Sequence, residues 1–320
     1  MKAKTKWLIF ATVVLVIGLI TFGGAMSMLD WDFSKLSTIK YETNEHTVSE
    51  SFGGVYVETH TADVELLPSE DGVVRVVCFE EKNVKHEVTV EGGMLTIRVQ
   101  DMRKWYEHIG INFKTATVKI YIPEGDYGML VINSTTGDVT VNDGYTFDGI
   151  GITATTGDVR CYADTTGDCN IYVTTGDVHI EDITARALNV SRSTGSITVL
   201  NAYVDTDVDV EVTTGGVKLA SLVAGNVSVE TDTGRVTLAS VIAGKFSVYT
   251  DTGDVRLDMS DAAEIFIETD TGDVTGTLLS EKIFITECDT GMVRVPHSVA
   301  GGRCEITTDT GDIIITIKQK

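Results

Sequence analysis

The sequence predicts an all-β fold: a two-sided parallel β-solenoid of about ten coils of 19–20 residues, preceded by one N-terminal transmembrane helix. Three observations predict it. A Thr-Gly pair recurs at a nearly fixed spacing, apolar and polar residues alternate on both sides of each pair, and an uncharged apolar run lies near the N-terminus. The 320 residues include 31 Gly and only 3 Pro, which favours strands joined by glycine turns.

The apolar run comes first. Residues 7–29 contain no charge and no proline, and a helix of this length crosses the hydrocarbon core of a bilayer. Three lysines lie in residues 1–6, whereas Asp30 and Asp32 follow the run. The positive-inside rule then predicts a cytoplasmic tail over 1–6 and an extracytoplasmic remainder, which makes the chain a single-pass protein of the cell membrane. The alternative is a signal peptide cleaved near the small residues 25–27, which also exports the rest of the chain.

The Thr-Gly pair marks each coil. Residues seven and five positions before its glycine are apolar, and so are those two and four positions after it, as in Val227, Val229, Val236 and Leu238. Alternation with period two indicates a strand with one buried face, and glycine suits the tight turn between two such strands. A second corner is expected about ten residues after the first. The turn glycines, spaced by 19 or 20 residues, are Gly137, Gly157, Gly176, Gly195, Gly215, Gly234, Gly253, Gly272, Gly291 and Gly311.

The remaining segments follow from these two features. Residues 30–44 are polar and are predicted to be a linker, and residues 45–128 to form an irregular β-rich N-terminal cap. Within the cap, Thr61-Ala62-Asp63-Val64 is a degenerate Thr-Gly-Asp-Val, so the first, degenerate copy of the repeat is expected there. Residues 129–320 form the β-solenoid repeat domain. The lysines at its end are expected to protect an exposed last strand from edge-to-edge pairing.

Composition and motifs exclude several function classes. A net charge of −22 opposes binding to nucleic acid. No metalloprotease, nucleotide-binding or nucleophile motif is present, so we predict no enzyme activity and no cofactor. The six histidines fall in no ligand pattern. The five cysteines mostly occupy apolar slots of the repeat, where they are expected to be free, buried thiols.

Aspartates provide the one candidate site. The residue two positions before the turn glycine is aspartate in five successive coils, and stacking would place these carboxylates about 4.8 Å apart. Aspartate also often follows the glycine, as in Asp254 and Asp273. We expect these carboxylates to cap turns by accepting backbone N–H bonds and to hold no metal. Calcium, which would relieve their repulsion, is the alternative. The candidate calcium ligands are Asp232, Asp251, Asp270, Asp289 and Asp309.

A family resemblance rests on three quoted stretches. The run from Val118 to Pro123, then Leu130-Val131-Ile132, then repeated Thr-Thr-Gly-Asp-Val resembles a bacterial putative-adhesin family, over about residues 45–320. The resemblance implies a β-solenoid domain of unknown function, often behind a single membrane helix. It also implies a surface location, and it brings no catalytic residues.

The predicted function is therefore a membrane-anchored, extracytoplasmic, non-enzymatic module for surface adhesion or scaffolding. Its partners would be the membrane, through residues 7–29, and an unknown surface protein or glycan. One alternative is an accessory or sensor component of an envelope-stress system. A more remote alternative is a polysaccharide-active β-helix enzyme, which would need carboxylates and basic residues in one groove.

Overall fold

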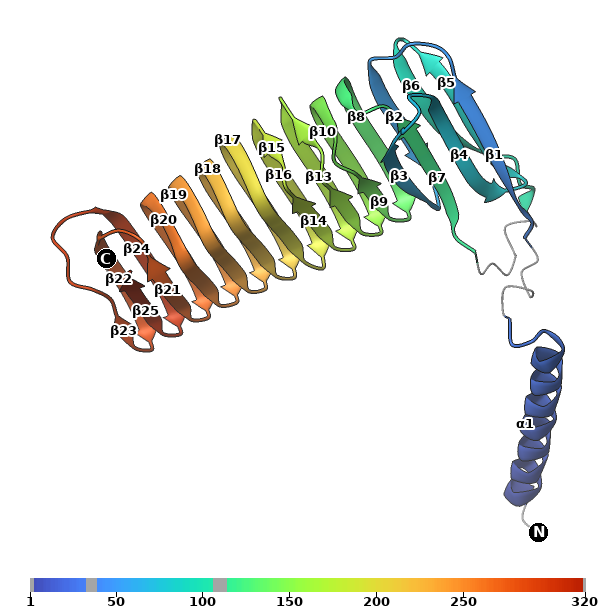
Figure 1. The fold of residues 1–320 in the computed structure, drawn as a ribbon. Coiled ribbons are helices and arrows are strands. Elements are labelled where there is room, and N and C mark those ends of the chain that lie inside the picture. The colour runs from blue at the N-terminus through green and yellow to red at the C-terminus, as the bar shows by residue number, and fades with distance from the viewer. Residues whose placement is uncertain (1–2, 33–38, 106–113, 319–320) are drawn as a thin grey trace.

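A rod of stacked β-coils dominates the molecule (Figure 1). The structure, a computed structural model, describes residues 3–32, 39–105 and 114–318. Helix α1 (Ala3–Met28) lies apart from the rod, and within Thr5–Met28 an 18-residue stretch has a mean hydropathy of 2.5 and is unburied, whereas Met26 is buried. It is long and apolar enough to cross a membrane, although a signal sequence passes the same test. The predicted all-β solenoid of about ten turns with one N-terminal apolar helix is confirmed.

Each coil stacks on the next in parallel register. In strands β18 (Val217–Thr233) and β19 (Val236–Thr252), Val217 pairs with Val236 and Val229 pairs with Val248, so the same repeat position recurs in both layers. The side chains of these strands alternate between inward and outward positions, and the inward ones, which are mostly apolar, fill one continuous core. The four longest strands each run around the second corner and contribute to both sides: β17 (Ile197–Thr214), β18 (Val217–Thr233), β19 (Val236–Thr252) and β20 (Val255–Thr271).

The earlier coils are built from shorter strands with the same stacking. Gly167, ten residues after Gly157, lies in the second-corner column, because Arg186 N donates to its carbonyl oxygen at 3.0 Å. The strands of this part are β8 (Gly125–Thr136), β9 (Val139–Val141), β10 (Tyr145–Thr156), β11 (Val159–Cys161), β12 (Asp164–Thr165), β13 (Asp168–Thr175), β14 (Val178–Glu181), β15 (Thr184–Ala185) and β16 (Ala187–Thr194).

The turn glycines stand in a column where two coils approach closely. A Cβ built on Gly157 would lie 2.1 Å from the carbonyl oxygen of Gly137, and one on Gly253 would lie 1.9 Å from that of Gly234. Gly157 also has a φ of 136°, in the region that favours glycine, whereas Gly253 has no such φ. At Gly253 the close approach alone requires glycine, a reason that the turn pattern did not reveal.

A further bend, which the sequence pattern did not predict, lies six residues after the turn glycine. The chain there adopts a positive φ of 51° to 57° at non-glycine residues. Asp, Asn and Ser tolerate this conformation better than branched residues do, which explains why small polar side chains dominate the column. Its members are Asp182, Asn201, Ser221, Ser240 and Met259.

The last coils do not stack in sequence order. Strand β24 (Gly302–Thr310) lies between β20 and β22 (Lys282–Thr290), and β25 (Ile313–Ile317) lies between β21 (Val274–Leu278) and β23 (Val293–Arg294). The chain therefore builds the outermost coil first and then returns to insert its last coil beneath it. Two expectations are wrong: coils do not follow one another in sequence order here, and the lysine-terminated last strand is interior. The exposed edge is β22–β23.

Burial and one ion pair explain this order. At one inward position the inserted coil carries Ile306, which is fully buried, whereas its register partner in the outermost coil is the polar Thr286. Lys282 on β22 reaches past the inserted coil, and its buried Nζ lies 2.5 Å from Asp261 Oδ1. Gly302, the register partner of Lys282, has no side chain in the way. The more apolar coil thus takes the interior place, and a buried ion pair ties the outermost coil to β20.

At the other end, extra strands extend both sides of the rod. Strands β2 (Gly54–Thr59) and β3 (Ala62–Pro68) form a first coil in register with β8 and β9. The degenerate repeat at Asp63 is therefore part of a regular coil. β6 (Met94–Asp101) continues one side and β5 (Val84–Glu91) pairs antiparallel with it. β7 (Ala116–Ile122) continues the other side, followed by antiparallel β4 (Val74–Glu81) and β1 (Tyr41–Val48). β1 begins inside the range expected for the linker, and Tyr41 and Asn44 are already paired there.

Candidate functional site

The aspartates that follow the turn glycine bind the backbone of the neighbouring coil. Asp273 Oδ1 accepts a hydrogen bond from the backbone N–H of Asp312 at 2.8 Å, and Asp158 Oδ1 accepts one from Asp177 at 2.8 Å. Each contact satisfies a turn N–H, so the acidic residue of the Thr-Gly-Asp-Val motif has a structural role. The same contact is made by Asp63, Asp138, Asp177, Asp254 and Asp312.

The aspartates two positions before the glycine face solvent. In spatial order they are Asp232, Asp251, Asp270, Asp309 and Asp289, because the last coil is inserted. Asp251 is half-buried and the others are exposed. A hydrogen bond to Asp251, together with the charges of Asp251, Asp270 and Glu268, raises the pKa of Tyr249 to about 12. Calcium binding by this column stays a hypothesis, since exposed carboxylates in a row are common without an ion.

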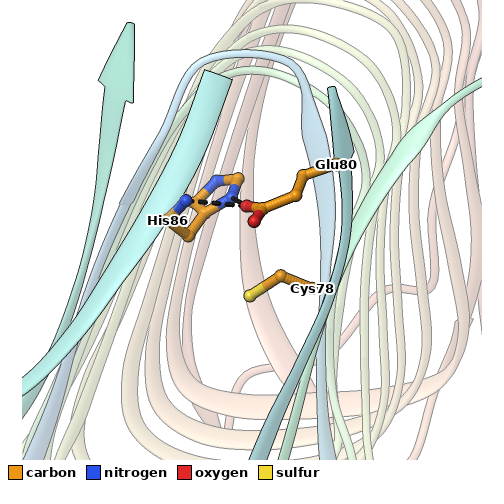
Figure 2. Close-up of side chains that lie close together, drawn as sticks. All are labelled: Cys78, Glu80 and His86. Atoms are coloured by element: carbon orange, nitrogen blue, oxygen red, sulfur yellow. Dashed lines mark hydrogen bonds and ion pairs between the residues drawn. The ribbon is translucent and has the colours of Figure 1, made fainter. Parts of the chain in front are cut away.

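A buried polar cluster lies in the cap, where the sequence indicated no site. Figure 2 shows Cys78 and Glu80 on β4 facing His86 on β5. The three side chains offer a thiol, a carboxylate and an imidazole whose ligand atoms all lie within 4.8 Å of one another. Their residues are 0%, 1% and 4% exposed, respectively. These are the donor types that zinc binds in proteins, so the fit to a metal needs testing against the hydrogen bonds.

Every nitrogen and oxygen of the cluster already has a protein partner. His86 Nδ1 lies 2.8 Å from Glu80 Oε2, which also accepts the backbone N–H of His86 at 2.7 Å. Asn44 Nδ2 donates to Glu80 Oε1 at 2.6 Å, and His86 Nε2 lies 3.0 Å from Thr59 Oγ1. A metal would have to replace these bonds. The arrangement is therefore best explained as a network that joins β1, β2, β4 and β5.

The titration behaviour agrees with a structural network. Burial alone would raise the pKa of Glu80, but the hydrogen bonds from His86 and Asn44 outweigh it and hold that pKa below its ordinary value of 4.5. Burial, reinforced by the charge of Glu80, raises the pKa of the Cys78 thiol to about 12. The thiol is therefore protonated at neutral pH and is not poised as a nucleophile.

Sequence reasoning missed this cluster because no motif marks it. Its one signal is an acid at an inward position: Val76, Cys78 and Glu80 alternate along β4 and are all buried. A carboxylate in a core slot requires a buried partner, but the alternation does not say which residue supplies it. The other inward cysteines lie in the solenoid. Cys288 is only half-buried, because it belongs to the outermost coil.

Comparison with known proteins identifies the family. The model of the family described as Toastrack DUF4097 matches residues 55–206 and 191–320. The chain belongs to the Toastrack DUF4097 family. The expected resemblance is thereby confirmed. No curated protein matches this Toastrack chain.

Several solved structures are similar to this chain. A putative adhesin from Parabacteroides merdae is 11% identical, with 88% of this chain and 97% of that chain covered and a TM-score of 0.46. A putative lipid binding protein from Parabacteroides distasonis is 14% identical, with 88% and 98% covered and a TM-score of 0.41. A putative adhesin from Bacteroides fragilis is 13% identical, with 86% and 97% covered and a TM-score of 0.34. At these values nothing about ligand or partner follows for the Toastrack chain.

Mutations in the two aspartate columns should change the free energy of unfolding by different amounts. Asp273→Ala removes a charge-assisted bond to the next coil and should lower the free energy of unfolding by about 1.5–3 kcal/mol. Asp270→Ala, three residues away and exposed, should change it by less than about 0.5 kcal/mol. Urea unfolding measures both. Equal losses would contradict the assignment of roles, and a rise in melting temperature with calcium that Asp270→Ala abolishes would establish the metal alternative instead.

The cluster in the cap predicts a pH-dependent stability. Because the pKa of Glu80 is lowered in the folded chain, its contribution is present above pH 4.5 and is lost as the pH falls through the lowered value. Glu80→Gln should cost about 1.5–3 kcal/mol at pH 7, and the difference from the wild type should narrow in acid. Exposed Glu87→Gln is the matched control and should show neither effect. A constant difference between pH 7 and pH 3 would contradict the prediction.

Proposed function

We propose that this Toastrack protein is a non-enzymatic module of the bacterial cell surface, anchored by α1 and extended outward by the solenoid. One observation carries the proposal: an apolar helix whose large side chains from Trp7 to Phe22 are exposed precedes a rod whose own core is closed. Such a helix has no burial site in the described rod, so a bilayer is the environment that suits it. The lysines before it and the aspartates after it favour the rod outside the cell.

The carboxylates of the solenoid also favour a binding module over an enzyme. Polysaccharide cleavage at a β-helix surface needs acids converging with basic groups in one groove. Here the aspartates after the turn glycine are engaged by backbone N–H groups, as Asp273 shows, and those before it stand in an open row. The most buried acid outside the solenoid, Glu80, is engaged by Asn44 and His86. None of these arrangements is poised for general acid–base catalysis.

Surface exposure can be tested by labelling cysteines in intact cells. Val223→Cys, at a 46% exposed position of the solenoid, should react with a membrane-impermeant maleimide without lysis. Thr5→Cys, in the first turn of α1 at its expected cytoplasmic end, should react only after lysis. The wild type supplies the background, because four native thiols are buried.

Two results would contradict the proposal. Protection of Val223→Cys until lysis would place the solenoid in the cytoplasm. Release of the labelled rod into the medium without residues 3–28 would show a cleaved signal peptide in place of an anchor. Chemical crosslinking from position 223 then separates an adhesive role, with partners on other cells or in the matrix, from a sensor role with partners in the same membrane.

A further inference from the structure

A row of outward-facing side chains runs lengthwise along one side of the rod. Tyr172 on β13 is in register with Thr153 on one neighbouring strand and Ser191 on the other. The row continues coil by coil to a second tyrosine, four steps away, at about 19 Å for a strand spacing of about 4.8 Å. Its central part contains, in order, Thr153, Tyr172, Ser191, Glu211, Glu230 and Tyr249.

The surface over this row is hollowed into a trough. Two adjoining depressions, of about 450 and 290 Å³, share Tyr172, Ser191, Glu211 and Glu230. A third, of about 330 Å³, includes Tyr249 further along the row. The flanking rows supply amides, hydroxyls and carboxylates: Asn189, Asp209 and Ser228 on one side, and Thr174, Ser193, Thr213 and Asp232 on the other.

Tyr172 presents an open aromatic surface in the trough. It is 49% exposed, and its neighbours in the row, Thr153 and Ser191, are small. Next to it, Asn189 Nδ2 donates to Asn170 Oδ1 at 2.8 Å, which fixes two amides at the rim. An exposed ring beside fixed polar groups suits a ligand with one apolar face and several hydroxyls.

The trough is rich in acceptors. Partial burial, followed by the charges of Asp207 and Glu211, raises the pKa of Asp209. Among the described residues that line the first two depressions, the one cation is Arg192. Its side chain is buried, and its Nη1 lies 3.5 Å from Asp177 Oδ1, near the turn edge. The carboxylates of these two depressions therefore have no exposed basic side chain among the lining residues, and they favour ligands that donate hydrogen bonds or carry positive charge. In the third depression Glu305 is paired with Arg303.

We propose that this trough binds a linear glycan of uncharged or amine-bearing sugars, laid along the rod axis with a sugar ring stacked on Tyr172. The proposal deepens the proposed function, because it rests on the rod being outside the cell, where such glycans occur. Sugar hydroxyls and ammonium groups donate to Glu211, Glu230 and the flanking side chains. Acidic glycans are repelled by the same carboxylates and by the net charge of −22. A length of four coils between Tyr172 and Tyr249 accommodates several sugar units.

Calorimetric titration of the full chain, held in a detergent without a sugar headgroup, tests the proposal. The probes are cellohexaose, N-acetylated chitohexaose, the fully deacetylated chitosan hexamer and hexagalacturonate. At least one of the first three should bind, whereas the acidic hexagalacturonate should not. Tyr172→Ala should weaken that binding about tenfold or more, since an aromatic contact dominates such a site. Tyr203→Ala is the matched control, because Tyr203 is 52% exposed but does not line the trough, and it should leave affinity unchanged.

The outcomes separate this inference from the proposed function. No binding of any uncharged or aminated hexamer at millimolar concentration would overturn the glycan proposal, as would equal losses in Tyr172→Ala and Tyr203→Ala. Binding of hexalysine in place of the sugars would assign the trough to a basic peptide and would also overturn it. None of these results would bear on the surface location of the rod, which the maleimide labelling of Val223→Cys tests independently.

Discussion

The whole rod depends on register between successive coils. A parallel ladder such as Gly157 N to Thr175 O, at 2.9 Å, forms only if each coil returns to the same place after 19 or 20 residues. The same condition puts the buried aliphatic side chains of one coil on those of the next. Glycine at the turn allows the close approach, and the aspartate after it bonds to the next turn. The Thr-Gly-Asp-Val motif is therefore the part of each repeat that makes the turn-to-turn contact between coils.

The strand edges at the two ends of the rod are covered in different ways. At the N-terminal end, antiparallel strands continue both sides, and the buried Glu80–His86 network fixes the strands to one another. At the C-terminal end, a more apolar coil is inserted beneath a less apolar one, and the ion pair of Lys282 and Asp261 holds the outer coil to β20. Along its length the rod offers a row of tyrosine, hydroxyl and carboxylate side chains, which is where we locate ligand binding.

Much of this architecture could be predicted from the sequence, because it follows from periodicity. Local patterns in the sequence predict the coil length, the inward and outward positions and the apolar helix. The degenerate repeat at Asp63 could also be recognised. Three features could not be predicted in this way. One is the positive-φ bend six residues after the turn glycine, as at Ser221. The insertion of the last coil depends on relative burial and on one ion pair between Lys282 and Asp261, and the repeat spacing is the same for either order. The cluster of Cys78, Glu80 and His86 joins separate strands, so spacing along the chain carries no sign of it.

The stacking order at the C-terminal end tests the account most directly. Side chains at 270 and 309 flank register pairs on adjacent strands, about 4.8 Å apart, whereas 289 lies one coil further out. Asp270→Cys with Asp309→Cys should form a disulfide on mild oxidation, since the spacing suits its geometry. Asp270→Cys with Asp289→Cys should not. Efficient crosslinking of the second pair and none of the first would show that the coils stack in sequence order and would contradict the structure.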